Sequence, residues 1–209
     1  MFSQKQEQKK QMDLIAEAVK IGEVIEATTS GFTAQCYHLN KAPSLGSLVK
    51  IKNVPLEIYA VVHNIENHSL EIGRRPIARG EKEETEQAIF NANPQLTRLL
   101  CTDFSAMVVG HRQESNILHY LPPKPAYIHN FVYICPSDEV KDFTSSFDFL
   151  SLLVNASLPV PTDEVIAACL RYSSQAHPNP QAFLVRAGKE LAMLLSGQAK
   201  RLNSILKRL

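Results

Sequence analysis

The chain has 209 residues, of which 44% are hydrophobic and 21% charged, so it is long enough for one sizeable domain or two small ones. Its formal charge of +1 at pH 7 argues against a uniformly basic nucleic-acid binder and leaves room for a local patch. The apolar runs are too short to span a bilayer, and the opening MFSQKQEQKKQMD lacks the apolar core of a secretory signal. We therefore expect no membrane span and a cytoplasmic location.

The four cysteines lie far apart, and none of them forms a C-x-x-C pair. They are Cys36, Cys101, Cys135 and Cys169. Zinc sites usually take their ligands from closely spaced pairs, so this pattern predicts no metal. Because each cysteine has apolar sequence neighbours, we expect buried thiols in a reducing compartment.

Residues 19–136 are predicted to form β-strands, because short runs alternate apolar and polar residues and are rich in β-branched types. The predicted strands are residues 21–27, 32–39, 48–51, 58–65, 104–110, 117–120 and 131–135. A turn is expected at Asn67 and His68. Short strands separated by Gly, Pro and Asn favour a small closed antiparallel barrel, which leaves no sheet edge exposed.

A helical insertion is predicted at about residues 80–101. Its first helix should begin in the acidic run after Gly80, since negative charges suit the positive end of a helix dipole. Asn93–Pro94 should end that helix, and the leucines between 96 and 100 predict a second short one.

The apolar period changes to that of helices in residues 137–209. Thr162 is expected to cap one helix, and a final helix is predicted to start near Gln181. One face of that helix repeats at close to 3.5 residues. This face carries Leu184, Leu191, Leu195, Leu202, Ile205 and Leu209.

The predicted fold is therefore α+β, with strands and helices segregated along the chain. Residues 1–18 form an N-terminal tail, residues 19–136 form the barrel, and residues 137–209 form a C-terminal helical region.

Several stretches carry a family resemblance. The region opens with three successive stretches, IGEVIEATTSGFTAQCY, GSLVKI and IYAVVHNI. The acidic run is flanked by GRRPIARG and NPQLTRLLCTDFSAMVVG. The region closes with YLPPKPAYIHNFVYICPSDEVKDFT. In this order they resemble the HAS-barrel. That six-stranded barrel is found ahead of the ATPase core in HerA-type DNA-translocating hexamers and at the start of ATP synthase main subunits. The resemblance implies a barrel fold and an assembly role.

The resemblance does not carry over ATP hydrolysis. A phosphate-binding loop has the pattern G-x-x-x-x-G-K-[ST], in which closely spaced backbone amides wrap the phosphates. Residues 137–209 contain two glycines, Gly188 and Gly197, and neither is followed by Lys-Ser or Lys-Thr. No G-x-S-x-G elbow or Cys–His signature places a nucleophile either. We expect no catalytic residue and no cofactor.

Two basic clusters are the candidate partner-binding sites. Arg74, Arg75 and Arg79 suit phosphate or carboxylate, although the acidic residues 81–86 could neutralise them within the chain. The final helix is the second cluster, because residues 181–209 carry a net charge of +5. Its predicted binding residues are Leu195, Lys200, Arg201, Leu202, Leu206, Lys207 and Arg208. The alternative is a helix that packs on its own bundle with its basic residues in solvent.

Two further motifs are given structural interpretations. His63, Glu66 and His68 could be a metal triad, but His63 and His68 differ by five positions and would face opposite sides of a strand. The prolines of residues 122–125 could form a docking loop, and we expect a rigid connector between strands instead.

These observations predict a non-catalytic adaptor or assembly factor. It would bind a protein partner or a multi-subunit complex through the barrel and the basic amphipathic helix. The alternative is an RNA- or ribonucleoprotein-binding protein, in which the barrel or the basic helix meets phosphate. An enzyme is the third hypothesis, and a homo-oligomer is compatible with all of them.

Overall fold

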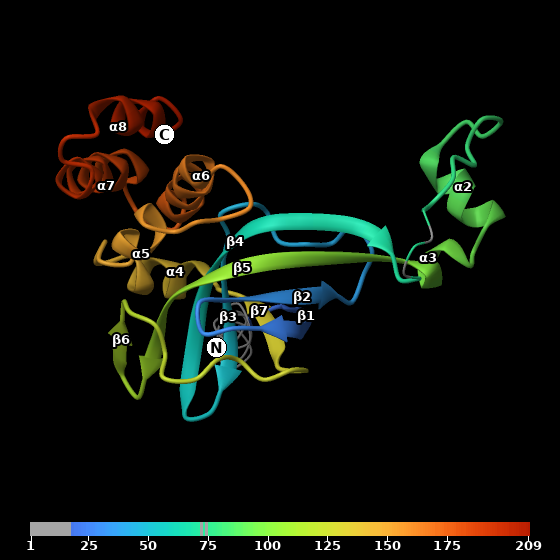
Figure 1. Cartoon of the computed structure of the whole chain (residues 1–209), viewed down its shortest axis with the longest axis horizontal. Coiled ribbons are helices and arrows are strands. Elements are labelled where there is room, and N and C mark those ends of the chain that lie inside the picture. Colours follow the sequence, from blue (N-terminus) through green and yellow to red (C-terminus); the bar gives the residue numbers. More distant parts are fainter. Residues whose placement is uncertain (1–17, 72, 74) are drawn as a thin grey trace, which may run out of the picture.

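The computed structural model describes residues 18–71, 73 and 75–209, so Arg74 and residues 1–17 of the predicted tail lie outside the described residues. The strands are β1 (Lys20–Ala27), β2 (Gly31–Cys36), β3 (Leu48–Asn53), β4 (Leu56–Ser69), β5 (Leu100–Gln113), β6 (Asn116–Leu118) and β7 (Phe131–Ile134). All except β6 form one antiparallel ring in the order β2, β1, β7, β3, β4, β5, which the β2–β5 pairing closes. The predicted α+β fold with a six-stranded barrel is therefore confirmed (Figure 1).

Strand β4 corrects the sequence prediction, because it continues through Asn67 and His68 instead of turning there. Asn67 pairs with Thr102 and His68 with Cys101 on β5. The Thr102 hydroxyl also donates to the Asn67 side chain at 2.5 Å. Cross-strand pairing thus overrides the turn preference of asparagine.

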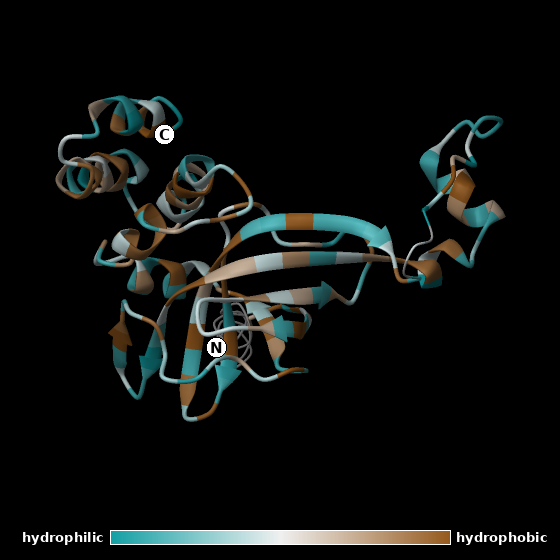
Figure 2. Ribbon diagram, in the orientation of Figure 1, coloured by the Kyte–Doolittle hydropathy of each residue, from teal (hydrophilic) through white to brown (hydrophobic). Residues whose placement is uncertain are grey.

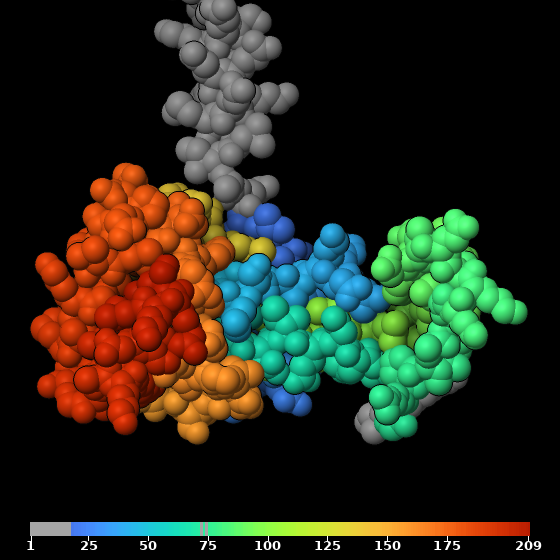
Figure 3. All heavy atoms as spheres, turned by 90° about the horizontal axis from the view of Figure 1, so that it is seen from above, coloured from blue at the N-terminus to red at the C-terminus, as the bar shows by residue number. Residues whose placement is uncertain are grey.

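Strands β4 and β5 leave the barrel as a two-stranded ribbon. This ribbon and the described residues of 70–99 form a projection that we call the arm (Figure 1). The arm carries α2 (Glu86–Ala92) and α3 (Leu96–Leu99), so the predicted helical insertion is present. The first helix starts later than predicted, because the Thr85 side chain caps it by accepting the Ala88 N–H. Figures 1 and 3 show the arm and the C-terminal helices at opposite ends of the barrel.

A helical layer follows the barrel. It contains α4 (Ser137–Phe143), α5 (Leu150–Val154), α6 (Thr162–Ser174), α7 (Pro180–Leu194) and α8 (Ala199–Leu206). Thr162 is the first residue of α6 and not its cap, because Pro161 occupies the cap position. Within the described residues, none of the helices has the length and apolar character needed to cross a membrane.

The single final helix predicted from Gln181 is wrong. The chain breaks after α7 and folds back as α8, with Gly197 at φ +84° in the connection. Glycine adopts this left-handed conformation without steric cost, so the chain can reverse there. The 3.5-residue repeat therefore combines two separate helices, each with an apolar face of its own.

Two hydrophobic cores lie on the two sides of the barrel wall. The interior core contains Val24, Phe32, Ile58, Phe104 and Val132, all from barrel strands. The second core joins outward-facing wall residues such as Tyr59 and Val109 to Phe143, Leu150 and Leu170 of the helical layer. Figure 2 shows apolar stretches on these helices and on strands beside them. The barrel and the helical layer therefore share buried surface.

A buried polar network also links α4 to the barrel wall. The Glu139 carboxylate accepts from the Lys50 ammonium at 2.7 Å and from the Tyr59 hydroxyl at 2.7 Å. Arg112 donates to the same Tyr59 hydroxyl at 3.0 Å. Burial works to lower the pKa of Lys50, but hydrogen bonding and charge from Glu139, with the charge of Glu57, outweigh it and raise that pKa. Burial and the bond to Glu139 raise the pKa of Tyr59. This network orients α4 through charge-assisted hydrogen bonds.

Candidate functional site

Helix α7 presents apolar residues on two faces, and only one of them is covered. Phe183, Ala187 and Leu191 face the second core and are buried. On another face of the same helix, Val185 is 49% exposed. An exposed apolar helix face beside a second helix is the basic requirement for docking an amphipathic segment.

A groove runs along this uncovered face, between α7 and the end of the chain. Its lining residues are Gln181, Leu184, Val185, Gly188, Lys189, Ala192, Leu206 and Leu209, around a volume of about 470 Å³. Gly188 faces α8, since a Cβ atom there would lie 3.3 Å from the Leu206 side chain. We call this feature the C-terminal groove.

The predicted leucine stripe is divided between the core and this groove. Leu195 is 1% exposed and lies inside the second core, and Leu202 packs against the same core. Leu206 is 39% exposed and lines the groove. Of the three leucines predicted to meet a partner, Leu195 is buried, Leu202 is partly buried, and Leu206 is the exposed one.

Two of the predicted basic contacts are used within the chain. Arg201 donates to Asp163 at 2.8 Å and to the Val154 carbonyl at 3.0 Å. Arg208 forms an ion pair with Glu164, on the same first turn of α6. These guanidinium groups hold α8 against α6, where the acidic residues also suit the helix dipole.

Three lysines of the C-terminal helical region have no such partners. Lys189, Lys200 and Lys207 are exposed, and among the described residues none of them lies within ion-pair distance of a carboxylate. Lys189 itself lines the groove. The groove therefore combines a mainly apolar lining with one lysine that is free to meet an acidic group.

The arginine cluster of the arm is only partly described, since Arg74 lies outside the described residues. Arg75 and Arg79 are exposed, and Arg79 donates to the Asn93 side chain at 3.5 Å. Within the described part of the arm, neither arginine forms an ion pair with the acidic residues 81–86. Both arginines therefore present their guanidinium groups to solvent without a direct carboxylate partner from that run.

A lysine–aromatic surface lies on the barrel wall, and the sequence does not reveal it because its residues are far apart. Lys20 lies over the rings of Tyr37 and Phe131, at 5.2 and 4.2 Å from their centroids. Lys52 lies over Tyr133 at 5.1 Å. Strand pairing of β1 with β7, and of β7 with β3, assembles these groups.

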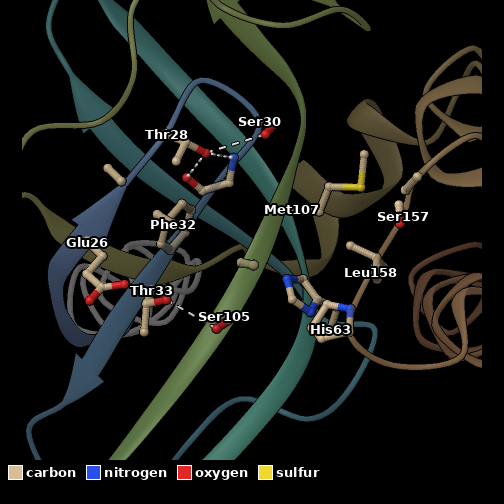
Figure 4. A pocket seen from close by; sticks show the side chains of 15 residues that line it. Glu26, Thr28, Ser30, Phe32, Thr33, His63, Ser105, Met107, Ser157 and Leu158 are labelled. Atoms are coloured by element: carbon tan, nitrogen blue, oxygen red, sulfur yellow. Dashed lines mark hydrogen bonds between the residues drawn. The ribbon is translucent and has the colours of Figure 1, made fainter.

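A third feature is a pocket of about 390 Å³ between the β1–β2 hairpin, β5 and residues 156–159 (Figure 4). His63 lines it, because a bulge between Val62 and Asn64 interrupts the pairing of β4 there. The imidazole Nδ1 is buried and has no hydrogen-bond partner within the described structure. His63 thus lies apart from Glu66 and His68, so the three do not form a triad.

The barrel fold agrees with the family comparison. Residues 21–114 match the family model of the HAS barrel domain, which agrees with the sequence resemblance. The match covers β1 to β5, and β7 completes the ring. No curated protein matches the chain.

Proposed function

We propose that this protein is a non-catalytic adaptor or assembly factor whose C-terminal groove binds an amphipathic helix of a partner protein. The observation that carries the proposal is a mainly apolar groove that includes Lys189, which has no carboxylate partner among the described residues, on helices whose other faces pack against the core. The partner helix should place apolar side chains on the floor and acidic side chains against the lysines.

Charge complementarity favours an amphipathic helix with acidic side chains over an uncharged helix as the partner of the C-terminal groove. Apolar anchors supply most of the affinity in such complexes, while charges on the rim set orientation and association rate. Ion pairs with α6 already hold Arg201 and Arg208, so Lys189, Lys200 and Lys207 are the cations left for a partner. The four free, buried cysteines support a reducing compartment such as the cytoplasm.

The experiment compares two glutamate substitutions on α7 in an affinity capture from native lysate. Val185→Glu places a carboxylate on the groove floor and should reduce partner capture by about tenfold or more. Met193 is 65% exposed and is absent from the groove lining, so Met193→Glu is the matched control. A photo-crosslinker at position 185 should label the same partner. Equal capture by both variants would contradict the proposed docking site.

The Leu202→Glu variant tests whether this leucine binds a partner or packs within the protein. Because Leu202 lies against the second core, we expect this variant to lower the melting temperature instead of acting on a partner alone. Lys207→Glu should weaken capture in a salt-dependent way and leave the melting temperature nearly unchanged.

Binding of single-stranded RNA is a second candidate function, and the lysine–aromatic surface is the observation that supports it. Phe131 is 43% and Tyr37 42% exposed, so bases could stack on their rings while Lys20 meets phosphate. Phe131→Ala should reduce RNA affinity in fluorescence anisotropy, and Tyr127→Ala is the exposed aromatic control. Nuclease treatment of the lysate should remove the captured partner if RNA mediates the interaction.

A further inference from the structure

Three side chains with metal-binding atoms meet at the base of the arm, outside the surfaces described above. His68 pairs with Cys101 across β4 and β5, and Asp103 lies two residues further along β5 on the same side of the ribbon. Their ligand atoms all lie within 4.8 Å of one another. The continuation of β4 through His68 brings them together, so a turn at that position would have separated them.

The distances between these groups are close to those between ligands that share one metal. The Cys101 sulfur lies 3.5 Å from His68 Nε2 and 3.6 Å from Nδ1, and Asp103 Oδ2 lies 2.9 Å from Nε2. In tetrahedral zinc sites, bond lengths of about 2.0–2.3 Å place neighbouring sulfur and nitrogen ligands roughly 3.5 Å apart.

The outer contacts also suit metal ligands. The second imidazole nitrogen, Nδ1, lies 3.0 Å from the Ser69 carbonyl, which orients the ring and leaves Nε2 toward the cluster. Gln35 donates to Asp103 Oδ1 at 3.2 Å, so the other carboxylate oxygen, Oδ2, is the one directed at His68. Carbonyl and amide partners of this kind commonly fix the first ligands of zinc.

Cys101 is buried beside the other two groups. It is 6% exposed, and its thiol also lies 3.7 Å from the His68 carbonyl.

We propose that His68 Nε2, Cys101 Sγ and Asp103 Oδ2 bind one zinc-class divalent cation, with solvent as a fourth ligand. The His68 side chain is 45% exposed, so the site is open on one side. Binding replaces the thiol proton and the proton between Nε2 and Asp103, and both pass to the buffer. The metal would join β4 to β5 where the arm leaves the barrel. This inference departs from the sequence prediction of no metal and is independent of the C-terminal groove.

The test uses the full chain and cobalt(II) as a spectroscopic substitute for zinc. Cobalt should bind with a stoichiometry of one and produce a thiolate charge-transfer absorption band, which zinc should remove by competition. Cys101→Ser should abolish the band. His68→Gln and Asp103→Asn should each lower the affinity by more than the roughly 10–100-fold typical of an outer-shell change, and Gln35→Leu by about that amount.

His129→Gln is the matched control, because His129 also pairs with a carboxylate, Glu23, at 3.0 Å and has no cysteine in that pair. Its cobalt spectrum and affinity should be those of the unmodified protein. Circular dichroism should show that every variant is folded. Absence of the charge-transfer band in the unmodified protein, or its persistence in folded Cys101→Ser, would overturn the proposal.

Discussion

Replacement of Glu139 by alanine is expected to lower the free energy of unfolding by about 3 kcal/mol, because it removes the nearer of the two carboxylates that pair with the buried Lys50 and leaves Glu57 at 3.5 Å. The side chains of Lys50 and Glu139 are only 10% and 11% exposed, and their charged atoms lie 2.7 Å apart. The same substitution also removes the acceptor of the Tyr59 hydroxyl. Urea unfolding followed by circular dichroism measures the loss.

Asp138 provides the control for this prediction. It lies in the same first turn of α4 and is exposed, so Asp138→Ala should change the stability by less than about 0.5 kcal/mol. The double variant Lys50→Met with Glu139→Leu should recover much of the loss, because a buried ion pair can be replaced by packed apolar groups. A loss for Glu139→Ala as small as that for Asp138→Ala would show that the network does not hold α4.

Substitution of Gly46 by alanine is expected to cost about 3 kcal/mol or more. Gly46 has φ +81°, and a Cβ atom there would lie 2.4 Å from the backbone of Ala168 and of Cys169 in α6. The variant would therefore combine left-handed backbone strain with a collision against main-chain atoms that cannot rotate away. The loop before β3 and α6 would have to separate.

Gly197→Ala distinguishes these two contributions. Gly197 has φ +84°, but a Cβ atom there would meet no neighbour within 4 Å, so only the backbone strain of about 1–2 kcal/mol should remain. Unfolding curves of the two variants under identical conditions give the comparison. If the two variants lost similar amounts of unfolding free energy, the loop that contains Gly46 and α6 would be able to move apart at little cost.

Local patterns in the sequence, either alternation or a continuous run of β-branched residues, are enough to predict the barrel strands. Ile58, Ala60 and Val62 are buried in the interior core, while Tyr59 and Val61 face the second core, so β4 is apolar on both sides. The length of β4 could not be predicted, because Asn67 and His68 favour turns locally and their partners lie more than 30 residues later. Long-range pairing, which local patterns do not encode, decides such cases.

The candidate sites were less accessible to sequence reasoning. A 3.5-residue repeat cannot distinguish one helix from two that fold back at Gly197, and so it does not separate Leu195 in the core from Leu206 in the groove. Val185 and Gly188 carry a helical spacing that could have revealed the second face of α7. Cys101 and His68 are brought together only by strand register, which spacing rules for zinc ligands do not consider.

The two-sided wall formed by β4 and β5 restricts how related sequences can differ in length. A single inserted or deleted residue within either strand would exchange inward and outward side chains, and would thus disturb both cores at once. None of the described residues of 70–99 belongs to either core. Length variation during evolution should therefore concentrate at the tip of the arm, where segments can be gained, lost or replaced while the barrel keeps its register.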